Sequence, residues 1–529
     1  MTIASLVAAR AATDGGRIAV ISVPEARELS YGELDSSANR IANSLVGLGV
    51  QPGDRIACWM ATSIAYLQLY LAVVKVGAVI VPTNERYLAG EAEYQFQDCD
   101  PRVIVADNER LSRFGRGSRE LAPTALISID DDPPVECTAR FADLLAGPDR
   151  PPAIVVDEDS PMIVGYTSGT TGFPKGAVLT HNGVKALARI NAMGNRLPVG
   201  SVAIFGGSMS FTASVPAIFM THLYLSGTIV IVPSRDPDMV GDAIQRYHAN
   251  FTSVAPPLVD DYVREWGRHP EQIATLRSIL QAAGKVPPEK LAPLNELLQG
   301  RLVLGWGMTE NCGGLVTATT VQDMRRALGG ASHLLDSVGR PVPDCIVRVQ
   351  GDDGRVLPRD GESVGELVFR SSSLMVGYTG RAAKTDTSLR EGWYHSGDLG
   401  AMDAEGYVYI RERRSDLIVS GGMNIYPSEV ERVIAQMSGV VECCVVSVPH
   451  PRWGRAVAAV VVARPGAQIS EADVIDYVRA RLASFKKPTQ VAFVEAIPMS
   501  VSGKIQRKDL VNLFTDGDGA AAAADGTGS

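Results

Sequence analysis

The chain has 529 residues, more than one hydrophobic core supports, so roughly three or four structural units are expected. Apolar residues make up 46% of it and charged residues 21%, the balance of a soluble globular protein. The formal net charge is -9, and no run of Lys and Arg interleaves with aromatic residues, which excludes nucleic acid and anionic membrane surfaces as expected partners.

The cysteines and the N-terminus indicate a cytoplasmic protein. None of the seven cysteines stands in CxxC spacing, and Cys443 and Cys444 lie in an apolar run, as is usual in a reducing compartment. The first residues, MTIASLVAAR, lack the basic start of a cleaved signal. Residues 63–82 and 211–233 are apolar, but prolines, glycines and polar residues interrupt them, so we expect buried core and no transmembrane segment.

From Leu29 to about residue 340, helical and strand-like patterns alternate. A helix over 31–48 precedes short apolar strands over 55–59 and 78–81, and this alternation predicts parallel sheets of the α/β kind. After residue 340, shorter strands and Gly/Asp turns predict a smaller β-rich unit that ends near Arg411.

The charged segment RERRSD at 411–416 is the candidate linker. It predicts an N-terminal domain over 1–411, a hinge over 412–416 and a compact α/β domain over 417–514. In the last domain, capping boxes of Ser428 with Glu431 and of Ser470 with Asp473 each predict a helix start, and strands are expected over 440–448, 456–463 and 490–494. The low-complexity tail 515–529 is expected to be disordered.

The most informative segment is YTSGTTGFPKG, residues 166–176, between two apolar strands. Its hydroxyls and glycines suit a loop that wraps a polyphosphate, and a lysine adds a point charge; the candidate residues are Thr167, Ser168, Gly169, Thr170, Thr171 and Lys175. Pro174 and Gly176 around the lysine exclude a Walker A loop, so another kind of nucleotide site is predicted. By composition alone a solvated linker would be favoured, but the flanking buried strands argue against it.

Further motifs follow along nearly the whole chain: GWGMTE at 305–310, GELVFR at 365–370, GYTG at 377–380, WYHSGDLG at 393–400, RRSDLIVSGGMNIYPSEVE at 413–431 and SGKIQRKDL at 502–510. Together with YTSGTTGFPKGAVLTH they resemble the adenylate-forming superfamily, in its acyl-CoA synthetase branch. The resemblance implies an α/β fold with a large N-terminal domain of two doubly wound sheets plus a β-rich subdomain, and a small mobile α/β C-terminal domain. It also implies ATP, Mg²⁺ and coenzyme A as cofactors.

The resemblance assigns roles residue by residue. Lys504 is the implied catalytic lysine of adenylation, Thr309 contacts phosphate, and Glu310 holds Mg²⁺. The implied nucleotide-binding residues are Ala283, Gly284, Trp306, Gly307, Asp398, Ile410 and Arg413. Gly421 and Gly422 would let the pantetheine arm pass, and the hinge position aligns with Ser415, where Asp or Lys is more usual. Without the neighbouring motifs, Asp398 reads as a turn residue, Glu310 as an exposed carboxylate and Lys504 as a solvated lysine.

The acyl pocket is predicted around Phe211 and Thr212, with Gly305, Gly313 and Gly314. Amino-acid-activating relatives carry Asp where this chain has Thr212, and a threonine cannot pair with a buried ammonium. The predicted substrate is therefore a small-molecule carboxylic acid without an α-amine, whether fatty, alicyclic or aryl.

The expected function is ATP-dependent acid:CoA ligation through an acyl-adenylate. The alternative is an adenylating enzyme that loads a carrier-protein phosphopantetheine; a nucleotide-binding module without chemistry is disfavoured because both Glu310 and Lys504 are present. The acid itself is not specified by the sequence, and a homodimer is left open.

Overall fold

The computed structural model describes residues 1–114, 123–167, 174–282, 284–420, 423–499 and 505–515. The chain divides into two compact units. The first comprises residues 1–347, 368–395 and 406–408, and the second comprises residues 348–367, 396–405 and 409 onward. Each unit is described by itself, and the domain bounds drawn from the sequence stay a prediction.

The first unit contains two large sheets. Sheet A runs in the order β16 (Arg340–Pro341), β15 (Leu315–Ala318), β14 (Leu302–Gly307), β13 (Ser278–Gln281), β12 (Phe251–Val254), β10 (Val202–Phe205), β11 (Thr228–Ile231), β1 (Ile18–Ser22) and β2 (Arg27–Ser30). The strands from β14 to β1 in this order are parallel, whereas β15, β16 and β2 are antiparallel to their neighbours. Parallel strands joined through helices are the arrangement that the alternating pattern predicts.

Sheet B runs in the order β19 (Gly377–Tyr378), β9 (Lys175–Thr180), β8 (Pro161–Thr167), β4 (Val79–Pro82), β3 (Arg55–Trp59), β5 (Val103–Ala106), β6 (Ala125–Ser128) and β7 (Ala139–Arg140). From β8 to β7 the strands are parallel, and β9 turns back antiparallel to β8. The strand predicted over 55–59 is β3, and the run predicted over 78–81 is β4, one residue later.

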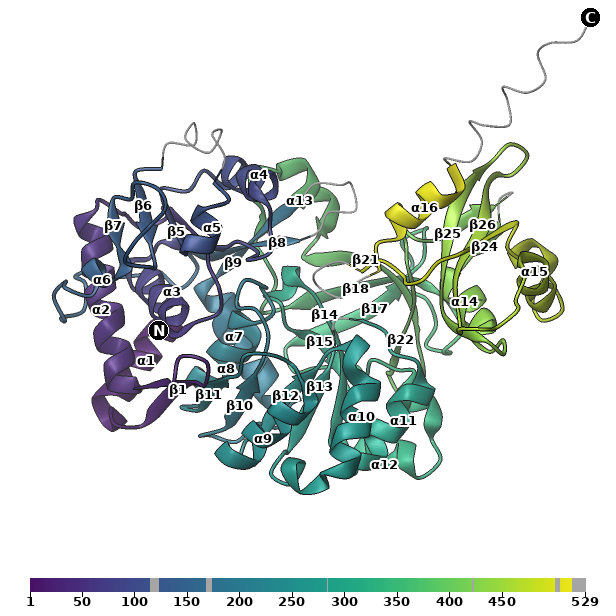
Figure 1. Ribbon diagram of the computed structural model, residues 1–529, viewed down its shortest axis with the longest axis horizontal. Helices are drawn as coiled ribbons and strands as arrows, with labels where there is room; N and C mark the ends of the chain where they lie inside the picture. The colour runs from purple at the N-terminus through teal and green to yellow at the C-terminus, as the bar shows by residue number, and fades with distance from the viewer. Residues whose placement is uncertain (115–122, 168–173, 283, 421–422, 500–504, 516–529) are drawn as a thin grey trace, which may run out of the picture. The chain divides into compact units, whose positions relative to one another are not determined.

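Helices cover both sheets. Their bounds are α1 (Ile3–Asp14), α2 (Tyr31–Gly47), α3 (Ile64–Val76), α4 (Ala89–Cys99), α5 (Asn108–Leu111), α6 (Phe141–Leu144), α7 (His181–Gly194), α8 (Met220–Tyr224), α9 (Pro237–Tyr247), α10 (Val259–Arg268), α11 (Pro288–Leu297), α12 (Val321–Leu328) and α13 (Ala382–Ser388). Helix α7 contacts β9 of sheet B and β15 of sheet A, so it lies between the two sheets (Figure 1).

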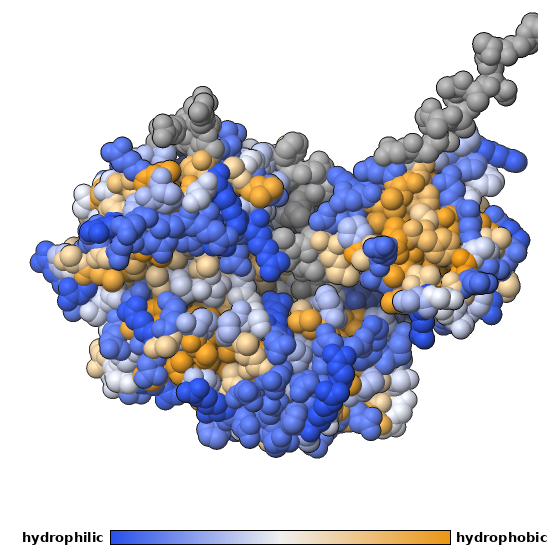
Figure 2. All heavy atoms as spheres, in the orientation of Figure 1, coloured by the Kyte–Doolittle hydropathy of each residue, from blue (hydrophilic) through white to orange (hydrophobic). Residues whose placement is uncertain are grey.

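The apolar segment 63–82 is buried core, as predicted. Nearly all of α3 is buried, and Lys75 within it pairs with Asp35 (Nζ to Oδ1, 2.7 Å) and with Asn39 (Nζ to Oδ1, 2.8 Å). A buried ammonium needs such partners. No described helix is long and apolar enough to cross a membrane, and Figure 2 shows hydrophilic side chains over much of the drawn face of the first unit.

A further sheet follows in the β-rich region predicted after residue 340. It consists of β17 (Cys345–Gln350), β18 (Gly365–Ser371), β20 (Leu389–Arg390), β21 (Trp393–Met402) and β22 (Val408–Arg413), whose residues are divided between the two units. The charged segment predicted as a linker starts inside β22, so Glu412 and Arg413 are strand residues.

The second unit continues with a hairpin of β23 (Ile418–Ser420) and β24 (Met423–Ile425), and with a sheet of β25 (Val440–His450), β26 (Gly454–Ala463) and β27 (Gln490–Phe493). Helices α14 (Pro427–Ala435), α15 (Glu471–Arg479) and α16 (Arg507–Thr515) pack against the latter sheet (Figure 1). The three strands predicted here are confirmed. Thr515, expected to begin the disordered tail, is instead the last residue of α16, and the rest of the tail, 516–529, lies outside the described residues.

Of the two predicted capping boxes, one is confirmed and one is wrong. Ser470 caps α15: its hydroxyl accepts a hydrogen bond from the Asp473 N–H, and the Asp473 carboxylate accepts one from the Ser470 N–H. Helix α14 instead begins at Pro427, so Ser428 lies inside it, where its N–H donates to Glu412 Oε2 and its hydroxyl donates to the Arg411 carbonyl. The Glu431 carboxylate accepts from Arg507 and from the Val445 N–H.

Candidate functional site

The two ends of the predicted phosphate loop are adjacent strand residues. Strand β8 ends at Thr167, β9 begins at Lys175, and these two residues are paired in the antiparallel register. Thr167 is half-buried and Lys175 is buried. The structure thus brings the first hydroxyl residue and the lysine of the predicted site together, whereas Ser168, Gly169, Thr170 and Thr171 lie outside the described residues.

A hydrogen-bonded network holds both ends of this segment. The Tyr166 hydroxyl donates to Asp98 Oδ2 (2.7 Å), and Arg381 Nη2 donates to Asp98 Oδ1 (3.0 Å) and to the Tyr94 hydroxyl (2.8 Å). The Tyr94 hydroxyl donates in turn to the Pro174 carbonyl (3.4 Å). The hydrogen bond to Asp98 raises the pKa of Arg381, and these contacts tie α4 and the segment after β19 to the strand ends.

This network was not predicted from the sequence. Tyr94 and Asp98 are four residues apart, so they share one face of α4, and that spacing is the only local signal. Their partner Arg381 follows the GYTG motif, 283 residues after Asp98.

Glu310 is held by a pair of buried tyrosines. After β14, the short helix η5 (Thr309–Asn311) presents Glu310, whose Oε1 accepts a hydrogen bond from the Tyr378 hydroxyl (2.8 Å). The Tyr394 hydroxyl lies 3.2 Å from that of Tyr378. Burial and the nearby Glu310 charge raise the pKa of both tyrosines, so both stay neutral hydrogen-bonding groups. Both tyrosines belong to quoted motifs, and the motifs are the signal that could have identified them.

A half-buried carboxylate with one fixed oxygen suits a magnesium ion that arrives with a nucleotide. Mg²⁺ usually binds through one or two carboxylates plus substrate phosphates, and Glu310 lies on η5, which contacts both β8 and β9. Among the residues that the structure describes, no group of three acidic, histidine or cysteine side chains forms a separate metal cage. The donor set therefore fits a metal shared with ATP, with Glu310 as the protein ligand.

Three predicted segments meet at Gly165 of β8, two residues before Thr167. A Cβ atom added to Gly165 would lie 2.5 Å from Thr212 Oγ1 and 3.1 Å from Thr309 Cγ2. The threonine of the predicted acyl segment and the threonine of the Glu310 motif thus both touch the strand that leads into the phosphate loop. Phe211, the neighbour of Thr212, is half-buried.

The loop after Glu310 packs on the same acyl segment. Gly313 has a φ of +78°, in the left-handed region, and a Cβ on it would lie 2.6 Å from Ala213 Cα. Asn311 fixes this loop: its Nδ2 donates to the Leu315 carbonyl (3.0 Å), and its Oδ1 accepts from Ser373 Oγ (2.8 Å). Only glycine allows this backbone approach without strain.

Leucine side chains fill the space beside the other two predicted pocket glycines. A Cβ on Gly314 would lie 1.8 Å from Leu187 Cδ1, and one on Gly305 would lie 2.4 Å from Leu315 Cδ2. Both leucines are buried. The predicted pocket segments are therefore brought together, and Leu187 and Leu315 limit the room beside them.

The residues predicted to contact the nucleoside differ in their exposure. The indole of Trp306 is buried and meets Phe369 edge-to-face, with ring centroids 5.7 Å apart. Gly307 and Gly284 are exposed, and Ala283 lies outside the described residues.

In the second unit, Asp398 and Arg413 are neighbours. Arg413 Nε lies 3.5 Å from Asp398 Oδ1, and the Asp398 side chain is 14% exposed. Ile410 is half-buried in β22, and the exposed Ser415 hydroxyl donates to Asp416 Oδ1 (3.0 Å). Gly421, Gly422 and Lys504 lie outside the described residues, so the roles predicted for this unit stay predictions.

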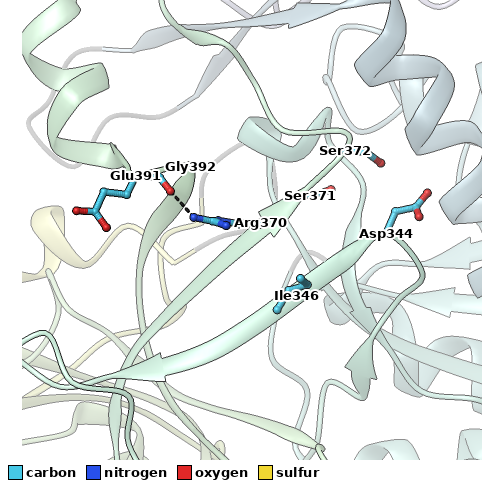
Figure 3. A pocket seen from close by; sticks show the side chains of 7 residues that line it. All are labelled: Asp344, Ile346, Arg370, Ser371, Ser372, Glu391 and Gly392. Atoms are coloured by element: carbon cyan, nitrogen blue, oxygen red, sulfur yellow. Dashed lines mark hydrogen bonds between the residues drawn. The ribbon is translucent and has the colours of Figure 1, made fainter.

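One surface hollow of about 550 Å³ in the first unit contains none of the predicted site residues (Figure 3). The side chain of Arg370 crosses it, donates to the Glu391 carbonyl and stacks 4.7 Å from the Trp393 ring centroid. Because this guanidinium is already engaged, the hollow offers no free cation to a ligand.

Comparison with known proteins places the chain in a family. The AMP-binding enzyme family matches residues 7–379, and the AMP-binding enzyme C-terminal domain matches residues 429–504. The chain belongs to the AMP-binding enzyme family. The predicted class, an AMP-forming acyl-CoA synthetase, is confirmed by the family and its CoA-ligase relatives, and enzymes of this class use ATP, Mg²⁺ and coenzyme A.

Three relatives illustrate the range of similarity. The long-chain-fatty-acid–CoA ligase FadD13 of Mycobacterium tuberculosis is 32% identical, over 92% of this chain and 93% of that protein. The fatty acid–[acyl-carrier-protein] ligase ScoC of Streptomyces coeruleorubidus is 31% identical, over 93% and 92%. The ATP-bound structure of MatB from Rhodopseudomonas palustris is 28% identical, covers 98% of this chain and 99% of that one, and has a TM-score of 0.86, which confirms the predicted fold class.

Proposed function

We propose that the protein activates a carboxylic acid lacking an α-amine as its acyl-adenylate and then transfers the acyl group to coenzyme A. The observation that carries this proposal is that Thr212 and Thr309 both lie against Gly165, which belongs to the strand that leads to Thr167. Acid, α-phosphate and the Glu310-bound metal have to meet at one place, and these segments supply a group for each.

In the first half-reaction, a carboxylate oxygen of the acid attacks the α-phosphorus of ATP, and the bond to the bridging oxygen breaks so that pyrophosphate leaves. A Mg²⁺ ion held by Glu310 would neutralise phosphate charge, and Lys175 and the Thr167 hydroxyl would stabilise the developing negative charge. In the second half-reaction, the CoA thiolate attacks the acyl carbon and AMP leaves. In this proposal Lys504 acts in the first half-reaction, a role that rests on the resemblance to the adenylate-forming superfamily.

The surroundings of Thr212 support an acid without an α-amine. Its side chain is buried against Gly165 and carries no charge, so an α-ammonium placed there would lose its hydration without a counter-charge. The leucines beside Gly305 and Gly314 add apolar surface, which favours a fatty, alicyclic or aryl substituent.

Separate assays of the two half-reactions test this function. Lys504→Ala should nearly abolish acid-dependent pyrophosphate exchange, while thioester formation from supplied acyl-adenylate largely survives. Lys508→Ala, a nearby exposed lysine, serves as the matched control and should leave both unchanged. Unaffected exchange in Lys504→Ala would show that the lysine has another role. A panel of aliphatic, aromatic and alicyclic acids, assayed for CoA-dependent AMP release, identifies the substrate class.

A second candidate is loading of a carrier-protein phosphopantetheine, favoured by the similarity to ScoC. Comparing CoA with a holo acyl carrier protein as acceptor for the same acyl-adenylate distinguishes the two. Acyl transfer to the carrier protein at a far higher kcat/KM than to CoA would favour this second function.

A further inference from the structure

Residues 371–375, at the end of β18, contact the loop that carries Glu310. The Met375 N–H donates to the Glu310 carbonyl (2.8 Å), and the Ser373 hydroxyl donates to Asn311 Oδ1 (2.8 Å). Asn311 and Ser373 are fully buried. Two alternate residues of one segment therefore hold the predicted Mg²⁺ ligand and its neighbour in the chain.

The direction of the hydrogen bonds in this cluster is fixed at Asn311. Both N–H bonds of its amide are used, because Nδ2 donates to the carbonyls of Gly314 (3.4 Å) and Leu315 (3.0 Å). The remaining amide atom, Oδ1, only accepts, so the Ser373 hydroxyl has to donate to it. A hydroxyl has one proton, and the Ser371 hydroxyl, 2.9 Å from that of Ser373, therefore donates to Ser373.

The series of donors begins at Cys345. Its thiol donates to Ser371 Oγ (3.3 Å), which also accepts from the Ser373 N–H (3.1 Å). Burial raises the pKa of Cys345 to about 11, so the thiol keeps the proton that it donates. Cys345, Ser371, Ser373 and Asn311 thus form one directed chain of hydrogen bonds, in which each bond strengthens the next.

This chain ends at the loop that packs on the predicted acyl segment. By holding the Leu315 carbonyl, the Asn311 amide closes the turn in which a Cβ on Gly313 would lie 2.6 Å from Ala213 Cα. Asn311 also follows Glu310 directly in the sequence. A change in the orientation of this one amide would therefore reach the predicted metal ligand and the predicted acid pocket together.

We propose, on the basis of the function proposed above, that Ser373 is a positioning residue for adenylation, which holds Glu310 and the loop 311–315 in place through Asn311. Without the Ser373 hydroxyl, Asn311 Oδ1 would be a buried acceptor that has lost its donor, which costs more than the loss of a hydrogen bond at the surface. The amide would no longer be fixed toward the Leu315 carbonyl, and the loop would move more freely.

Acid-dependent pyrophosphate exchange in the full-length enzyme tests this role. Ser373→Ala should raise both the KM for the acid and the Mg²⁺ concentration for half-maximal exchange about three- to tenfold, the effect of losing a neutral hydrogen bond. Ser373→Cys, which keeps a weaker donor of similar size, should give values between those of Ser373→Ala and the wild type. Ser372→Ala changes the exposed serine next to it and is the matched control, which should keep the wild-type values.

Hydrogen exchange of the protein without ligands gives a readout that does not depend on activity. In Ser373→Ala the backbone amides of 308–315 should exchange about three- to tenfold faster, for the same lost hydrogen bond, while those of β3 should keep the wild-type rate. Equal acceleration in β3 would show a general loss of stability and would overturn the positioning role.

The kinetic constants separate the positioning role from the proposed function. A lower kcat with both constants unchanged in Ser373→Ala, or wild-type values throughout, would overturn the role of Ser373. A rise in only one of the two constants would overturn the claim that this hydroxyl supports metal ligand and acid pocket together. A wild-type enzyme without acid-dependent exchange would instead refute the proposed function, and hydrogen exchange would still test the support of the loop.

Discussion

Replacing Asp98 by Asn should weaken ATP binding, although Asp98 lies outside every predicted motif. The carboxylate accepts from Tyr166 at 2.7 Å and from Arg381 at 3.0 Å, and the side chains of the ion pair are only 20% and 27% exposed. A hydrogen bond to a charged group contributes about 1.5–3 kcal/mol. If this whole free energy is lost from ATP binding, the KM for ATP rises about 10- to 150-fold.

We expect the lower end of this range, about tenfold, because Arg381 keeps its bond to Tyr94 and so still borders Pro174. The assay is the KM for ATP in acid-dependent pyrophosphate exchange, with the KM for the acid measured alongside. A double-mutant cycle with Arg381→Gln should give a coupling energy of about 1 kcal/mol or more, since the two groups are in contact.

The matched control is Asp143→Asn, which removes a carboxylate from an exposed Arg–Asp pair on the same unit. Exposed pairs contribute little, so its KM for ATP should stay at the wild-type value. A wild-type KM for ATP in Asp98→Asn, or a coupling energy near zero, would refute the claim that this ion pair positions the strand ends.

Three further predictions concern other parts of the first unit. Tyr378→Phe should raise the Mg²⁺ concentration for half-maximal exchange about three- to tenfold, because Glu310 loses the donor that orients it. Leu187→Ala should lower the free energy of unfolding by about 2–5 kcal/mol in urea titrations and should raise kcat/KM for bulkier acids, since Leu187 fills the space beside Gly314. Burial lowers the pKa of His181 to about 4, below that of an exposed histidine near 6.5. The unfolded chain therefore takes up the proton first, and stability should fall as the pH drops from about 6.5 toward 4; His181→Gln should remove up to about 3 kcal/mol of that fall.

Each of these three predictions would be contradicted by a specific outcome. A Mg²⁺ requirement unchanged in Tyr378→Phe would show that the tyrosine does not orient Glu310. If Leu187→Ala loses the expected stability but does not change the preference for bulkier acids, Leu187 belongs to the core and not to the pocket. An identical pH dependence of unfolding in His181→Gln would show that this histidine does not titrate in the expected range.

Local pattern predicted the strands well where burial and turns act together. The strand over 55–59 has the predicted bounds because an apolar run stands between turn residues. Strands β8 and β9 extend to Thr167 and Lys175, inside the segment 166–176 that was expected to be a loop, because the ladder between them continues to the Thr167–Lys175 pair. Such pairing depends on the partner strand, so the strand's own sequence does not reveal it.

Contacts between distant segments could not be predicted. The capping box expected at Ser428 does not form because Ser428 bonds Arg411 and Glu412 and because Arg507, 76 residues after Glu431, engages the Glu431 carboxylate. In the site, motif resemblance pointed to Glu310 and covered the segments that contain Tyr378 and Tyr394, but the contact of this tyrosine pair with Glu310 and the bond between Asp98 and Arg381 depend on tertiary packing.

Gly165 also constrains how this enzyme can be altered. Two threonine side chains from different loops already fill the volume that any side chain at residue 165 would occupy, so even alanine there would require both threonine side chains to move. Under the proposed function, changes in acid preference are expected from substitutions at the surrounding positions, such as 187 and 212, while residue 165 stays glycine. A library that randomises 187 and 212 together, with Gly165 kept, samples those changes.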